Sequence, residues 1–486
     1  MLKIIVGCLA LLLTLPGMAQ EVTARLDLSR KEPEPQWIEY SPTDGGLVTV
    51  SYASRRSSRI LNINKYDDLF NRQWSDQVLT QNGRAYIDLL TVLGDNIYVF
   101  VSEYFPRDRT IKTSYSHYDL DGNVIAEREV ISELPNVKEH RVDLKYTRSI
   151  NKKRLLCYKN LNNAGKREKV LYYLFDAESD EVISGEITIP YPDDKFTIRK
   201  IVVSNSGMIY VLGKYYHVNR VKTPDDYGFK VYRYLPGDPN GVDVDVELEE
   251  GNLFITDLTM KIDPQEYIYL AGFYSTRSTR EIIGTCSIRL DEAMETDLSS
   301  IQRFSDAFLN NFLKERQIDR GKELKNFYLD NIILRSDGGL LLIAEKFYTT
   351  YNNQIDIYGT AIEQRIYHYD DIIVSSVDGN GDLEWSNVAR KRQASPVQTH
   401  LSYLDVVSGA SLFLVYDYSP RRQPRTLYFN SVGMNGDVEP RDVLLPDFSG
   451  DDWFYPRMSA QISNEEAMLV YYQNRSKVFS IVKVAF

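Results

Sequence analysis

One arrangement of apolar segments recurs eight times along this 486-residue chain, and it constrains the fold more than any other feature. Each copy has an apolar segment, a turn rich in Gly, Asp, Asn or Ser, and a second apolar segment that ends in aromatic residues. Successive copies begin roughly 50 to 70 residues apart, a period typical of repeat architectures. The second segments are residues 47–52, 97–105, 155–158, 208–216, 267–274, 340–348, 412–418 and 467–472.

Most copies continue with a third and a fourth strand-like segment joined by a short turn, best seen at 118–124, 377–383 and 432–438. The Asn-Gly and Asp-Gly pairs there supply the positive φ angles of tight hairpin turns. A repeated unit of four antiparallel strands predicts an all-β chain that forms a single β-propeller. We expect about eight four-stranded blades, or seven if the weak third unit merges with a neighbour. Separate β-sandwiches are the alternative, but no Pro/Gly/Ser-rich linker divides the units.

The two ends of the chain complement each other. The last unit has only one strand-like segment, 478–485, after its second segment, whereas residues 22–28 form a strand-like segment before the first unit. We predict that 22–28 completes the last blade and removes two exposed strand edges. Two segments interrupt the period. Residues 305–317 have helical spacing and predict a helical insertion, and residues 349–364 form a Tyr/Asn-rich loop insertion that is a candidate for recognition.

The first 19 residues have the pattern of a secretory signal peptide, with Lys3, an apolar stretch and small residues up to Ala19. We therefore expect an exported protein with a mature region of 20–486, either periplasmic or extracellular. Cys8 lies within the apolar stretch, and no cysteine stands immediately after the predicted cleavage point, so the lipoprotein pattern is absent. No later segment predicts a membrane span. Only Cys157 and Cys286 remain, in different repeats, which argues against a disulfide framework.

Charge differs between two kinds of connection. The connections between second and third strands are basic in seven of the eight units, although the net charge of the chain is −11. The connections between third and fourth strands are acidic, for example at Asp119, Asp176 and Asp378. In a propeller these two kinds of connection lie on opposite faces, so the sequence predicts one basic face, with tyrosines at the ends of the second strands near its rim. The candidate binding residues are Arg55, Arg56, Arg107, Arg109, Arg167, Arg220, Arg277, Arg280, Arg421, Arg422, Arg425, Tyr104, Tyr216, Tyr274, Tyr348 and Tyr418.

We find no pattern of catalytic or metal-binding residues. The five histidines lack the spacing of metal ligands, and no CxxC, GxSxG or phosphate-binding loop occurs. Asp378 to Asp382 has oxygen donors at alternate positions, as at the start of a calcium loop, but position 389 is Ala where the loop requires Glu. A hairpin turn explains these residues better. We expect no metal and no cofactor.

The segment Ser376–Trp385 resembles a degenerate Asp-box of sialidases, or the tryptophan motif of quinoproteins. Both families are propellers, and both place the motif at a hairpin of a blade. The spacing here departs from each family, and only this one copy carries the tryptophan. The resemblance covers about ten residues, so it implies the fold and no activity. More broadly, the chain resembles exported bacterial propellers, on the basis of its first residues and its repeats.

These observations favour a non-catalytic binding or scaffold module of the cell envelope. Its basic, Tyr-rich face would bind an anionic polysaccharide or an acidic protein. The acidic net charge argues against a nucleic acid partner. The alternative is a carbohydrate-active enzyme, a glycosidase or lyase, with its site at the central channel. Clustered acids facing the channel would favour the enzyme, and an Arg/Tyr-rich rim without acids would favour the binding module.

Overall fold

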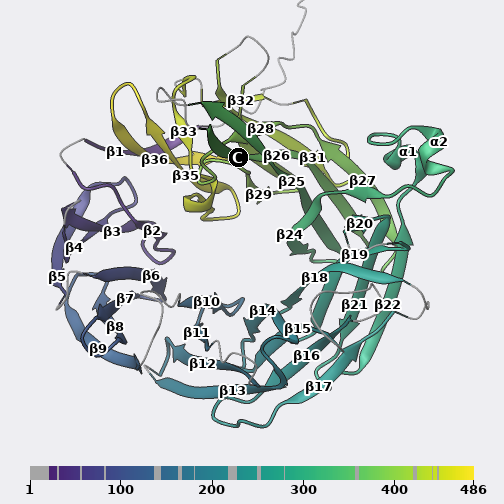
Figure 1. Ribbon diagram of the computed structural model, residues 1–486. Coiled ribbons are helices and arrows are strands. Elements are labelled where there is room, and N and C mark those ends of the chain that lie inside the picture. The colour runs from purple at the N-terminus through teal and green to yellow at the C-terminus, as the bar shows by residue number, and fades with distance from the viewer. Residues whose placement is uncertain are drawn as a thin grey trace, which may run out of the picture.

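The computed structural model of the protein describes residues 21–29, 32–54, 57–80, 84–135, 144–161, 167–179, 181–216, 227–248, 253–277, 280–355, 361–419, 424–440, 442–445 and 448–486. The predicted leader, residues 1–19, lies outside these ranges. The described residues form eight antiparallel blades arranged in a ring, each with four strand positions from the centre outward (Figure 1). A separate two-stranded sheet pairs β20 (Glu281–Ile282) with β23 (Leu324–Lys325). The chain is therefore an all-β, eight-bladed propeller, which confirms the predicted fold.

Blades 1 to 4 follow one another along the chain without a crossover. Listed from the innermost strand outward, they are β2 (Trp37–Tyr40), β3 (Leu47–Ser54), β4 (Ser57–Tyr66) and β5 (Arg72–Leu79); β6 (Ala85–Leu93), β7 (Asn96–Phe105), β8 (Thr110–Asp119) and β9 (Val124–Leu134); β10 (Lys145–Arg148), β11 (Arg154–Leu161), β12 (Arg167–Asp176) and β13 (Val182–Pro192); and β14 (Phe196–Val203), β15 (Ile209–Tyr216), β16 (Tyr227–Tyr234) and β17 (Val242–Val246).

Blades 5 to 7 have the same order with additions at their edges. They are β18 (Phe254–Ile262), β19 (Ile268–Ser275), β21 (Gly284–Leu290) and β22 (Thr296–Arg303); β24 (Phe327–Leu334), β25 (Leu340–Ile355), β26 (Ala361–Val377) and β27 (Leu383–Ala389); and β29 (Leu404–Ser408), β30 (Ser411–Tyr418), β31 (Thr426–Gly433) and β32 (Asp442–Leu445).

Blade 8 joins the two ends of the chain. Its strands are β33 (Trp453–Phe454) and β34 (Ala460–Gln461) on the inside, then β35 (Glu466–Gln473), β36 (Val478–Ala485) and, outermost, β1 (Val22–Leu28). β1 pairs with β36 in antiparallel register, with Leu26 opposite Ile481. The Ser480 hydroxyl also donates a hydrogen bond to Asp27, at 2.6 Å. The N-terminal strand therefore completes the last blade, as predicted.

The two interruptions have more structure than their sequences suggested. Residues 305–319 contain two single-turn helices, α1 (Asp306–Leu309) and α2 (Glu315–Ile318), where we expected one helix. They lie beside blade 6 in Figure 1 and bury Phe308, Leu309 and Ile318. The insertion 349–364 continues the hairpin of β25 and β26, which remain paired as far as Ile355 and Ala361. A short strand, β28 (Gln393–Ser395), pairs with β26 beyond the end of β27.

Adjacent blades are held together by apolar side chains and by loop contacts. In the interface of blades 4 and 5, Leu212 and Val231 pack in one cluster with Met260 and Ile288, all nearly inaccessible to solvent. Cys157 and Cys286 are buried in different blades and are not bonded to each other. Among the described residues, no helix combines the length and the apolar character that crossing a membrane requires.

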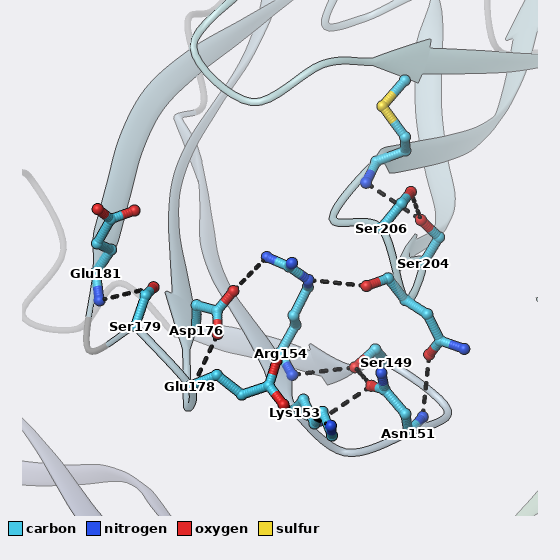
Figure 2. Close-up of polar contacts among 12 residues, drawn as sticks. Ser149, Asn151, Lys153, Arg154, Asp176, Glu178, Ser179, Glu181, Ser204 and Ser206 are labelled. Carbon is cyan, nitrogen blue, oxygen red and sulfur yellow. Dashed lines mark hydrogen bonds and ion pairs between the residues drawn. The ribbon is translucent and has the colours of Figure 1, made fainter.

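Polar contacts link the loops of blades 3 and 4 on one face of the ring (Figure 2). The Arg154 guanidinium pairs with Asp176 at 2.7 Å and donates to the carbonyl oxygen of Asn205 in the next blade at 2.9 Å. The backbone N–H of Asn151 donates to the side-chain oxygen of Asn205 at 3.0 Å. These loops join first to second and third to fourth strands, so this face is the one for which the sequence predicts acidic connections.

Candidate functional site

The opposite face carries the connection between the second and third strands of each blade, together with the links from blade to blade. We call it the upper face. All of the described candidate arginines lie on it, because they belong to or border those connections. Arg107, Arg109, Arg167 and Arg280 are exposed there. Five other candidates, Arg55, Arg56, Arg220, Arg421 and Arg422, lie outside the described residues.

Part of the basic charge on the upper face is already engaged within the protein. The Arg277 guanidinium donates to the carbonyl oxygen of Arg320, in the segment that follows α2, at 2.6 Å. Lys112 pairs with Glu133 on the adjacent strand at 3.2 Å. Arg425 lies 3.5 Å from the carboxylate of Asp417. The net charge of the loops therefore overstates the positive charge that remains available to a partner.

The five candidate tyrosines do not form one ring around the rim. Tyr104 and Tyr274 are each only 6% exposed, and Tyr274 belongs to the apolar cluster shared by blades 5 and 6. Tyr216 is half-buried and packs near Tyr227. Tyr348 and Tyr418 line cavities on the upper face, close to Arg425. The structure thus brings together three of the predicted residues, at blades 6 and 7.

We call the two adjoining cavities at this position the rim groove. They have volumes of about 670 and 330 Å³ and share Arg392 and Tyr418. The larger is lined by Arg392, Gln393, Ala394, Leu401, Asp417, Tyr418, Ser419 and Arg425. The smaller is lined by Tyr348, Asp370, Asp371, Arg390, Lys391, Arg392 and Tyr418. The groove forms because residues 390–392 bulge between β27 and β28, which continue one outer edge of blade 6.

The carboxylates of the rim groove all have partners within the protein. Asp371 pairs with Arg390 at 2.7 Å, and Asp370 accepts a hydrogen bond from the Tyr348 hydroxyl at 3.1 Å. Asp417 accepts from the Gln393 amide in addition to its contact with Arg425.

Arg392 differs from its neighbours in the groove. It is exposed, and it has no ion pair or hydrogen bond among the described residues. It interacts electrostatically with the ring hydroxyl of Tyr348. The rim groove therefore presents an exposed guanidinium without a direct ion pair, in a cavity that Tyr348 and Tyr418 also line.

A buried polar network lies beneath the groove. Lys391 is almost completely buried and forms an ion pair with Glu345, which is 5% exposed. The Lys391 ammonium also donates to the carbonyl oxygen of Tyr369 at 3.0 Å and to the Gln393 side chain at 2.9 Å. The Ser402 hydroxyl donates to Glu345 at 2.6 Å. A buried charge needs such partners, so this network fixes the positions of the 390–393 bulge and of the link into blade 7.

Burial shifts the pKa values of this network. Desolvation raises the pKa of Asp417 to about 6, and the neighbouring Arg425 opposes the shift. Desolvation also raises the pKa of Glu345 and lowers that of Lys391, with their mutual attraction acting against both shifts. Nearby, burial lowers the pKa of His400 to about 4. Shifts of this kind occur at functional sites and in structural ion pairs alike.

A third cavity, of about 400 Å³, opens on the inner side of the same blades, and we call it the inner pocket. Asp330 comes from the innermost strand of blade 6, and Tyr403 and Asp405 from the start of blade 7. Arg457 comes from blade 8, where the 3-10 turn η2 (Pro456–Met458) interrupts the inner strand between β33 and β34. The remaining lining residues are Tyr328, Leu329, Glu345, Phe347, Tyr369, Ser402, Leu404, Pro456 and Ser459.

The charges of the inner pocket nearly balance. Asp330 lies against the Tyr403 hydroxyl and interacts with Arg457, and enclosure by the surrounding side chains raises its pKa. Asp405 accepts a hydrogen bond from Asn331 at 2.9 Å and lies near Lys261. Acids therefore do face the channel, and the rim is not free of acids. Of the two features that we proposed to separate an enzyme from a binding module, the acids facing the channel are present and the acid-free rim is not.

Sequence reasoning missed Arg392, Asp330, Tyr403 and Arg457. Arg392 belongs to the Arg390-Lys391-Arg392 run after the fourth strand of blade 6, outside the connections that we examined for charge. That run was the available signal for the rim groove. The inner-pocket residues come from three blades, and no local pattern marks them.

The hairpin at Asp378 is a turn held by its own carboxylate. The amides of Asn380 and Asp382 both donate to Asp378 Oδ1 at 2.9 Å. Those bonds lower the pKa of Asp378. This geometry agrees with the hairpin interpretation. Within the described ranges, no group of three or more His, Cys, Asp or Glu side chains has an arrangement that could hold a metal ion.

Comparison with known proteins gives only distant structural matches. No protein-family model and no curated protein matches the sequence. The WD40 domain of SCAP from fission yeast is 10% identical, with 95% of this chain and 96% of that chain covered and a TM-score of 0.42. The polysaccharide lyase Uly1 is 10% identical over 94% of this chain and 90% of that chain, with a TM-score of 0.40. The β-propeller domain of the Trilobed protease from Pyrococcus furiosus is 11% identical over 87% and 97%, with a TM-score of 0.38. These matches concern the fold alone.

Proposed function

We propose that the protein is an exported, non-catalytic binding module that holds an anionic glycan in the rim groove. The observation that carries the proposal is Arg392, exposed at the junction of two cavities without an ion pair among the described residues. A planar guanidinium suits a carboxylate or sulfate group. The proposed export rests on residues 1–19.

The surroundings of Arg392 support a saccharide chain as the ligand. Tyr348 and Tyr418 flank it, and a tyrosine offers an apolar face for a sugar ring together with a polar tip. Among the carboxylates nearby, Asp371 forms an ion pair with Arg390 and Asp417 lies 3.5 Å from Arg425, so these two repel an anion less than free carboxylates would. The groove consists of two adjoining cavities of about 670 and 330 Å³, a size that suits a chain of sugar units better than a single small ion.

Affinity measurements with defined polymers test this proposal. We expect the protein to bind oligogalacturonate or a sulfated glycan, more weakly as salt increases, and to bind neutral dextran much less. Arg392→Ala should weaken the binding of the anionic glycan by about 10- to 100-fold, because it removes a charge-assisted hydrogen bond between the protein and the glycan. Arg107→Ala is the matched control, an exposed arginine on the upper face of blade 2, and should change affinity less than about twofold.

Three outcomes would contradict the proposal. Equal losses in Arg392→Ala and Arg107→Ala would mean that the whole face attracts anions without a specific site. Binding to poly-glutamate in place of every glycan would mean that the partner is an acidic protein. No binding to any anionic polymer at low salt would remove the rim groove as an anion site.

A carbohydrate-active enzyme is the second candidate, and the acids of the inner pocket favour it. Asp330 and Asp405 lie on innermost strands beside Tyr403 and Arg457, where two carboxylates, or a tyrosine with acidic helpers, could act on a glycosidic bond. Incubation with the same glycans, followed by product analysis, tests this candidate. Release of shorter saccharides by the native protein, lost in Asp330→Asn, would replace the non-catalytic proposal.

A further inference from the structure

The inner pocket contains a buried hydroxyl that lacks a well-aligned hydrogen bond within the protein. Tyr403 is 7% exposed, and its hydroxyl lies beside the Asp330 carboxylate and interacts with it, but the pair does not reach full hydrogen-bond geometry. Leaving a buried hydroxyl unpaired costs free energy, so such groups in native proteins call for an explanation. Because Tyr403 lines the pocket, a bound ligand is one such explanation.

The other polar groups of the pocket divide into two sets. Glu345 is bound to Lys391 and to the Ser402 hydroxyl, so its role is to hold the wall of the pocket. Arg457 is exposed and has no hydrogen bond or ion pair among the residues that the structure describes. Its position follows from η2, which breaks the inner strand of blade 8 and turns residues 456–458 out of strand geometry. Arg457 and Tyr403 are therefore donors available to a ligand.

The pocket also offers acceptors and an aromatic surface. Asp405 keeps one carboxylate oxygen on Asn331 and lines the cavity with the rest of its side chain. Tyr328 is 53% exposed at the same cavity and packs against Phe347 with ring centroids 6.1 Å apart. The volume of about 400 Å³ lies within the range of small-ligand sites.

We propose that the inner pocket is a second binding site, which takes one or two neutral sugar units. Donors from Tyr403 and Arg457, acceptors from Asp330 and Asp405, and the exposed ring of Tyr328 match the hydroxyl groups and the apolar face of a pyranose. A charged ligand fits less well, because Arg457 faces Asp330 and Asp405 lies near Lys261. The site is separate from the rim groove and does not depend on Arg392.

Saturation-transfer NMR with a panel of neutral sugars tests the proposal. The panel comprises glucose, galactose, mannose, rhamnose, N-acetylglucosamine and their common disaccharides at millimolar concentration, with the intact mature protein. We expect at least one member to bind. Tyr403→Phe should weaken the binding of that sugar about tenfold, because one hydrogen bond to the ligand is lost. The thermal midpoint of this variant should change little, because the hydroxyl that it removes makes only a poorly aligned contact with Asp330.

The two readouts separate a ligand role from a structural one. A purely structural hydroxyl would lower the thermal midpoint and leave sugar binding unchanged, which would overturn the proposal. Absence of binding to every sugar in the panel would also overturn it. Arg457→Ala is the second variant, and it should weaken the binding of the same sugar. Because the Arg457 side chain is exposed, we expect this variant to fold as the native protein does. Arg392→Ala should leave neutral-sugar binding intact, so failure of the rim-groove proposal is distinguishable from failure of this one.

Discussion

The indole nitrogen of Trp385 donates a hydrogen bond to the carbonyl oxygen of Met434 in the next blade, at 2.9 Å. The ring lies under the hairpin turn of blade 7, against Gly436. Blade 1 repeats this arrangement, because Trp74 donates to the carbonyl oxygen of Leu120 in blade 2 at 2.9 Å and lies against Gly122. In both blades, a tryptophan of the outermost strand forms a hydrogen bond with the hairpin turn of the following blade.

Gly436→Ala should destabilise the fold through this contact. Gly436 has a φ of +84°, and a β-carbon there would lie 2.5 Å from the Trp385 ring. The clash adds about 1–3 kcal/mol to the roughly 1 kcal/mol cost of a positive φ. Gly409→Ala is the matched control, since Gly409 has a φ of +56° and nothing within 4 Å of the added carbon. Denaturant unfolding measures the stability of both variants. Equal losses of stability would show that the close approach of Gly436 to the Trp385 ring contributes nothing.

The fold was predictable because its signals are local. The alternation of each blade and its Asn-Gly turns lie within a few dozen residues of each other. The closing strand at 22–28 was inferred from the strand that the last unit lacks, although the two pair across the length of the chain. The tryptophan contact was recognised only in part. We noted Trp385 and treated it as the only copy, whereas Trp74 occupies the equivalent place. It follows Asp67 by seven residues, as Trp385 follows Asp378, but the turn before it lacks the glycines of the Ser376–Trp385 segment.

The candidate site was predictable only in its broad location. Tyr348, Tyr418 and Arg425 were named from sequence and do meet at the rim groove. Arg392 could not be distinguished from Arg390, because only the fold shows that Arg390 pairs with Asp371. Lys391 between them is buried, which no charge count reveals. Asp330, Tyr403 and Arg457 meet only when blades 6, 7 and 8 close around the channel.

Arg154→Ala should loosen the contact between blades 3 and 4. The guanidinium is partly buried, pairs with Asp176 at 2.7 Å and reaches the Asn205 carbonyl oxygen of the next blade (Figure 2). Its loss leaves two acceptors unpaired, and we expect a decrease of about 1–2 kcal/mol in the free energy of unfolding. The adjacent Lys153 pairs with Glu178 on the exposed surface, so Lys153→Ala should cost less than about 0.5 kcal/mol. Urea unfolding measures the free energy of unfolding of both variants. Similar losses in the two would contradict the contribution that we assign to Arg154.

Lys391→Met should be among the most destabilising single changes in blades 6 and 7. It leaves Glu345 buried beside an apolar group, and breaking a buried ion pair costs about 3–5 kcal/mol. The double variant Glu345→Gln, Lys391→Met should recover much of that loss, because the neutral amide can still accept from Ser402. A double variant no more stable than Lys391→Met alone would show that the unpaired Glu345 is not the source of the loss.

Stability should depend on pH through Asp417. Burial raises its pKa to about 6 in the folded protein, above the ordinary 3.8, so the folded state binds this proton more tightly than the unfolded state. The contribution of Asp417 is therefore most favourable below about pH 4 and is lost as the pH rises through about 6. Asp417→Asn lacks this titration and keeps an oxygen that can accept from Gln393.

The free energy of unfolding of Asp417→Asn, minus that of the native protein, should consequently increase by the order of 1–3 kcal/mol between pH 4 and pH 7. The titration of His400, whose pKa burial lowers to about 4, is common to both proteins and cancels from the difference. Urea unfolding at four pH values measures the curve. A flat difference would mean that Arg425 and Lys391, the cations that face Asp417, fully offset its desolvation. A difference that falls with rising pH would mean that they hold the carboxylate ionised in the folded state.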